Sequence, residues 1–128
     1  MKIKINNKAS EAAPEYKIKG ISVGDVSVEI EKVATSNEAW VKVIIPLTSD
    51  RGYPWTKETG VTSSDNIGNI IMLLFREAVA AALFNADRRK IMTDEYSMSN
   101  IAKWEESIYN DRKGISDVNS AIQLMLRG

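Results

Sequence analysis

The chain has 128 residues, of which 44% are hydrophobic and 27% charged, a size and composition typical of one globular domain. Lysine plus arginine equals aspartate plus glutamate, 17 of each, so no net charge draws the protein to nucleic acid or to an anionic membrane. The sequence contains no cysteine and no histidine. This composition excludes disulfides, thiolate catalysis and cysteine-based zinc sites, and it removes the commonest general base near neutral pH.

Residues 1–15 are basic and lack a sustained apolar pattern. Ile3 and Ile5 alternate with lysines, and a stretch of small and polar residues then leads to Pro14. We predict a flexible basic arm over 1–15 and a single domain over 16–128. Two interpretations of the arm remain open: a disordered terminus, or a strand that pairs with the sheet edge of a neighbouring subunit.

Residues 16–48 have the period of two that is typical of β-strands. Three strands are predicted, over 16–21, 26–31 and 40–47, with a turn at Val23-Gly24-Asp25 and one apolar face formed by Val26, Val28, Ile30, Val41, Val43, Ile45 and Leu47. Pro46 cannot donate a ladder hydrogen bond, so we expect the third strand to fray there or to lie at an edge.

A long helix is predicted from Asp65 to Met92, with its start at Ser63-Ser64-Asp65. Its segment 67–84 is apolar on nearly every side, so more than one flank must be buried. A membrane span is disfavoured, because Arg76 and Glu77 would lie near the bilayer centre. We expect instead that a strip around Ile70, Leu74, Val79 and Phe84 contacts a second copy of the chain.

Two shorter helices are predicted after the long one. The first covers about 99–113 and ends at Gly114 as its C-terminal cap residue, and the second begins at Ser116. Strands followed by helices indicate an α+β fold: an N-terminal antiparallel three-stranded meander, a long central helix and two shorter C-terminal helices.

The stretch 49–65 is predicted to be a long loop and is the best candidate for a ligand site. Arg51, Tyr53, Trp55 and Lys57 alternate rings with cations, and Ser63 and Ser64 precede the predicted helix. Such residues suit a nucleotide-like anion or single-stranded nucleic acid. The alternative interpretation is a turn whose rings close one end of the core.

Other charged clusters favour structural roles. Asp94-Glu95 and Glu105-Glu106 are interpreted as solvated or helix-start acids, Arg88-Arg89-Lys90 as cations near a helix end, and Arg76-Glu77 as a structural ion pair or a snorkelling arginine. No phosphate-binding glycine motif is present in the sequence.

We therefore expect a non-enzymatic, cytoplasmic assembly protein that forms a homo-oligomer and needs no cofactor or metal. The alternative is a binding module for a nucleotide-like anion or single-stranded nucleic acid that uses residues 51–57. The Lys-, Asn- and Ile-rich composition with a basic arm resembles that of small phage or mobile-element proteins, without a motif to support the resemblance.

Overall fold

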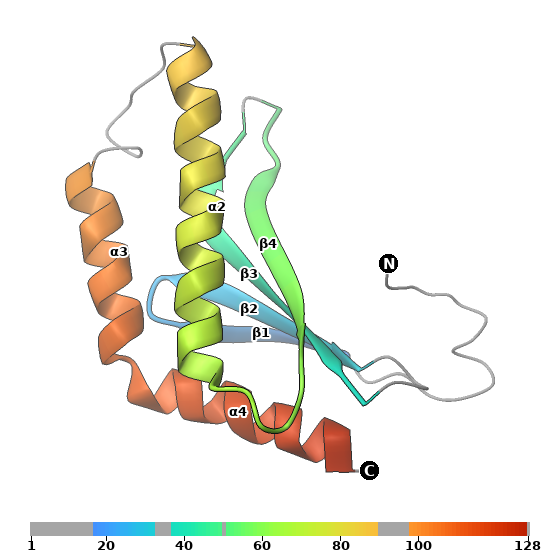
Figure 1. Cartoon of the computed structure of the whole chain (residues 1–128). Helices are drawn as coiled ribbons and strands as arrows, with labels where there is room; N and C mark the ends of the chain where they lie inside the picture. Colours follow the sequence, from blue (N-terminus) through green and yellow to red (C-terminus); the bar gives the residue numbers. More distant parts are fainter. Residues whose placement is uncertain (1–16, 33–36, 50, 90–97, 128) are drawn as a thin grey trace.

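A computed structural model describes residues 17–32, 37–49, 51–89 and 98–127. Four strands form an antiparallel sheet in the order β1-β2-β3-β4, and helices pack against one of its faces (Figure 1). The elements are β1 (Lys17–Val23), β2 (Val26–Lys32), β3 (Ala39–Thr48), β4 (Pro54–Val61), α2 (Ile67–Arg89), α3 (Met98–Asn110) and α4 (Arg112–Arg127). The predicted α+β class is confirmed. The predicted arm, 1–15, lies outside the described residues.

The predicted strand count was one too low, because β4 lies inside the stretch 49–65 that we expected to be a loop. β4 pairs with β3 alone, with Lys57 opposite Val43 and Thr59 opposite Val41. Of its eight residues, Val61 alone is buried. An edge strand that is mostly exposed needs no apolar alternation, so its sequence lacks the usual strand signal.

The apolar alternation of β2 and β3 is confirmed. Val28, Ile30, Val41 and Val43 are each 0% exposed and join a single core with α2 and α4. Of the two alternatives for Pro46, the edge position was wrong, because β3 is an inner strand between β2 and β4, whereas the ladder is interrupted around Pro46 as the fraying alternative expected. The pairing of β3 with β4 is irregular between Ile44 and Thr48, and an irregular ladder tolerates a residue without an N–H.

Helix α2 crosses β3 and β4 and is the central helix, as predicted. Its start was placed too early: the Asn66 side chain caps it by accepting a hydrogen bond from the Asn69 amide at 3.1 Å. Asp65 instead accepts a hydrogen bond from the Thr62 amide. The segment Ile67–Asn85 has the length and hydropathy (1.8) of a membrane span, and 39% of it is buried inside the chain.

The break between the last two helices differs from the prediction. Asp111 alone separates α3 from α4, and Gly114 lies in the first turn of α4 rather than after α3. A Cβ on Gly114 would lie 2.7 Å from the Ser22 carbonyl oxygen of β1. Glycine is therefore needed at position 114 because α4 approaches β1 closely there. In the sequence alone, such a glycine cannot be distinguished from one that ends a helix.

Candidate functional site

The six predicted ligand residues are not brought together. Arg51 and Tyr53 are exposed at the tip of the β3–β4 hairpin, whereas Ser63 and Ser64 follow the other end of β4. An eight-residue strand separates the two groups, which corresponds to roughly 25 Å. A single small ligand cannot contact both ends.

Two further residues of that set lie on β4 itself. Trp55 is partly buried and packs against the core, as the ring-closing interpretation expects. Its indole Nε1 is buried and has no hydrogen-bond partner among the described residues. Lys57 is exposed. The hairpin therefore presents Arg51, Tyr53 and Lys57 as separate exposed side chains.

The four predicted interface residues divide into two pairs. Leu74 (2% exposed) and Val79 (7%) lie in the chain's own core. Ile70 is partly buried against that core, and Phe84 is 62% exposed. The predicted strip therefore differs from the exposed apolar side of α2 by a rotation about the helix axis.

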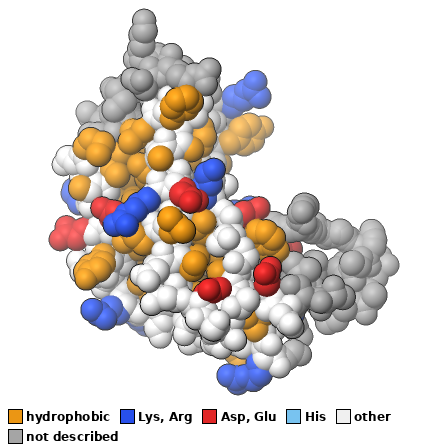
Figure 2. Space-filling model, viewed as in Figure 1, with side chains coloured by type: hydrophobic (Ala, Val, Ile, Leu, Met, Phe, Trp, Pro, Cys, Tyr) orange, Lys and Arg blue, Asp and Glu red, His pale blue; other side chains and the backbone are white. Residues whose placement is uncertain are grey.

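Exposed apolar residues gather on a neighbouring face of α2 and on α3. Figure 2 shows hydrophobic side chains over the upper half of this view, where α2 and α3 lie in front of the sheet. We call this surface the outer helical face; it is formed by Leu73, Ala80 and Phe84 of α2 and Met98, Ala102 and Tyr109 of α3.

A cavity of about 440 Å³ lies where α2, α3 and the start of α4 meet. Its apolar lining consists of Met72, Ile108 and Ile115. Its neutral polar side chains are Asn69, Tyr109 and Ser116. At Gly68, α2 borders the cavity without a side chain, and a Cβ there would make ordinary contacts with Asn66 and Ile115. The volume and the mixed lining are those of a small-molecule pocket.

Two arginines line this cavity, and no carboxylate is among its described lining residues. Arg76 donates from Nε to the Glu105 carboxylate, which joins α2 to α3. The sequence interpretation paired Arg76 with its neighbour Glu77, and the structure gives Glu105 as its partner. The Arg112 guanidinium makes no hydrogen bond or ion pair with another described residue.

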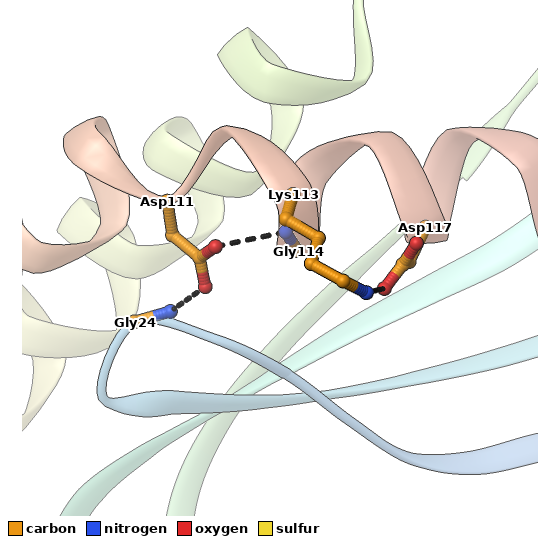
Figure 3. A network of polar contacts seen from close by, with 5 residues as sticks. All are labelled: Gly24, Asp111, Lys113, Gly114 and Asp117. Atoms are coloured by element: carbon orange, nitrogen blue, oxygen red, sulfur yellow. Dashed lines mark hydrogen bonds and ion pairs between the residues drawn. The ribbon is translucent and has the colours of Figure 1, made fainter.

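Asp111 fixes the start of α4 beside the cavity (Figure 3). One carboxylate oxygen accepts a hydrogen bond from the Gly114 amide of α4, and the other accepts one from the Gly24 amide in the β1–β2 turn, both at 2.8 Å. These two bonds, that from Gly24 first, lower the pKa of Asp111 below its ordinary value. Asp111 thus joins the sheet to the α3–α4 break.

The other charged clusters of the sequence lie partly outside the described residues. No group of three acidic, histidine or cysteine side chains among the described residues could hold a metal ion. Asp94-Glu95 and Lys90 lie outside the described residues. Arg88 and Arg89 belong to the last turn of α2.

The sequence analysis missed Asp111, Arg112 and the cavity as a whole. One available signal was Asp111 itself, because aspartate is among the residues preferred at the N-cap of a helix. Comparison with protein-family models, with curated proteins and with solved structures finds no match to this chain. The site therefore rests on its own geometry.

Proposed function

We propose that the protein is a non-enzymatic interaction protein that self-associates through the outer helical face. The observation that carries this proposal is the concentration of exposed apolar bulk there. Leu73, Phe84, Met98 and Tyr109 are 50%, 62%, 65% and 71% exposed. They are four of the six large hydrophobic side chains that are exposed among the described residues. A contiguous apolar patch is typical of an interaction surface.

The spacing of these residues supports a single continuous surface. Leu73, Ala80 and Phe84 follow one another at intervals of seven and four along α2, and Met98, Ala102 and Tyr109 at four and seven along α3. Such intervals place side chains on one side of a helix. Glu105 lies in the α3 row between Ala102 and Tyr109, and it pairs with Arg76 of α2. The two rows are therefore neighbours, with one neutralised ion pair between their apolar residues.

A second copy of the chain is the occupant that we propose. The helices α2 and α3 run in opposite directions (Figure 1), and an antiparallel pair can meet its own copy across a two-fold axis. Arg76 and Glu105 already neutralise each other within the chain, so Glu77 is the remaining charge near the middle of the α2 row. A polar group in an apolar seam weakens association but restricts its register.

The test compares matched variants by light scattering and sedimentation. Leu73→Glu places a charge in the apolar face and should weaken self-association on the order of a hundredfold. Leu124→Glu is the control, since Leu124 is 66% exposed on α4 and outside the face. Glu77→Leu should strengthen association. A wild-type chain that stays monomeric at high micromolar concentration contradicts the proposal, as does equal weakening by both glutamate variants.

A further inference from the structure

We infer that the cavity between α2, α3 and α4 is a binding site for a small organic anion, namely a carboxylate or phosphate group on a compact apolar body. This inference is independent of the proposed self-association. It rests on three observations: a cavity of ligand size, two arginines in its lining of which only Arg76 has an acidic partner among the described residues, and apolar side chains in the same lining.

The cavity lining contains two arginines. Arg112 is exposed at the cavity and has no ion-pair partner among the described residues. Arg76 uses its Nε for Glu105, and no hydrogen bond joins its two terminal nitrogens to the described residues. Both arginines line the cavity and keep N–H donors available to a bound anion, and charge-assisted bonds of this kind are the strong ones.

Arg112 is the first residue of α4 and directly follows the Asp111 cap. Both Asp111 carboxylate oxygens accept backbone amide hydrogen bonds, from Gly24 and Gly114, and the first turn of α4 contains no acidic residue. The Asp111 carboxylate offsets part of the positive charge of the helix N-terminus, and an anion bound at Arg112 would add to that stabilisation. The neighbouring Lys113 is neutralised by Asp117 at 3.0 Å, whereas Arg112 is not. The start of α2 at Gly68 and Asn69 also borders the cavity and also lacks an acid in its first turn.

The remaining lining residues indicate which uncharged part the ligand should have. Met72, Ile108 and Ile115 form an apolar wall, which favours a hydrocarbon or aromatic group and offers nothing to a sugar. Tyr109 adds a ring at the edge, and Ser116 adds a hydroxyl near Arg112. Inorganic phosphate alone would leave this wall uncovered, so the cavity suits an amphipathic anion.

The experiment is a titration of the full chain, followed by amide chemical shifts, with benzoate, phenyl phosphate, benzyl alcohol and inorganic phosphate. We expect benzoate or phenyl phosphate to shift the amides of Gly68, Asn69 and Ser116 saturably. Benzyl alcohol lacks the charge and inorganic phosphate lacks the ring, so both should bind at least about tenfold more weakly. The ratio of benzoate to phenyl phosphate affinity identifies the anionic group.

Two variants test the assignment to the cavity. Arg112→Gln should weaken the tighter anion roughly tenfold or more, whereas Lys103→Gln, an exposed cation on α3 outside the cavity, should leave it unchanged. Ser116→Trp should block binding by occupying the space. No saturable shift at millimolar ligand, equal binding of benzyl alcohol, or an unchanged affinity in Arg112→Gln in a chain with native circular dichroism overturns the inference.

Discussion

The two hairpin turns of the sheet differ in what surrounds them. The β1–β2 turn at Gly24 and Asp25 is held by α3 and by the break that follows it, because Asp111 accepts from the Gly24 amide and Ser107 accepts from the Asp25 amide. Among the described residues, the β3–β4 turn is closed by bonds to Ser49: its hydroxyl accepts from the amides of Arg51 and Tyr53 at 3.3 Å, and backbone bonds join it to Gly52 and Tyr53. The β1–β2 turn, which has no aromatic or cationic residue, is thus the constrained turn. The β3–β4 turn, which carries Arg51 and Tyr53, stays exposed.

This difference shows that residue chemistry alone does not place a site. Arg51 and Tyr53 have the chemistry of a ligand site, yet nothing in the described structure encloses them. The cavity lies instead near the constrained turn, where Asp111 fixes the start of α4. Enclosure depends on contacts between segments far apart in the chain.

The largest expected difference is in the free energy of unfolding when either of two glycines with the same type of backbone conformation is replaced. Gly24 and Gly52 both have positive φ, 60° and 88°. A Cβ on Gly24 would lie 2.6 Å from the Ile108 amide nitrogen, whereas one on Gly52 would meet nothing within 4 Å. We expect Gly24→Ala to lower the free energy of unfolding by about 3 kcal/mol and Gly52→Ala by about 1 kcal/mol. Urea denaturation measures both, and equal losses would contradict the comparison.

A smaller effect is expected from the side chains that hold the two turns. Asp111→Ala removes the cap of α4 and leaves the Gly24 amide without its acceptor, which should cost about 2 kcal/mol of unfolding free energy. Ser49→Ala removes two longer hydrogen bonds at an exposed turn and should cost about 0.5 kcal/mol. Thermal denaturation of the two variants checks the order. A Ser49→Ala loss as large as that of Asp111→Ala would remove the distinction between the turns.

The smallest effect is a pH dependence that belongs to the β1–β2 turn. Folding lowers the pKa of Asp111, because its carboxylate accepts backbone hydrogen bonds from Gly24 and Gly114. The resulting stabilisation is complete above the unfolded pKa and is lost as pH falls through the lower folded pKa. Between about pH 5 and pH 2, wild type should lose more stability than Asp111→Asn, which has no carboxylate to titrate. Parallel pH profiles of the two proteins would contradict this assignment.

Much of the fold follows from local patterns. The alternation in β2 and β3 predicted which face is buried, and the apolar run from Ile67 predicted the central helix, because both depend on residues close in sequence. β4 escaped prediction because an exposed edge strand needs no apolar side. The start of α4 was not predicted because Gly114 is required by a close approach to β1. A contact between residues so far apart in the chain leaves no local sequence pattern.

The candidate sites follow the same rule. The sequence indicated that α2 has more apolar surface than one sheet can cover, but the rotation of the helix put Leu74 and Val79 inside and Leu73 outside. A rotation by one residue depends on packing across the whole core. The cavity joins side chains from three helices, and Arg112 becomes a candidate only when Asp111 is known to end one helix and begin the next.

Tyr109 belongs to two surfaces at once: it lines the cavity, and it lies on the outer helical face. If a ligand changes how strongly one copy binds another, the second copy must change the ligand's affinity by the same factor, because the coupling free energy is shared by both equilibria. If the chain both self-associates and binds a ligand as proposed, the position of this one ring makes protein concentration a variable in measurements of ligand affinity. Ligand concentration then becomes a variable in measurements of molecular mass.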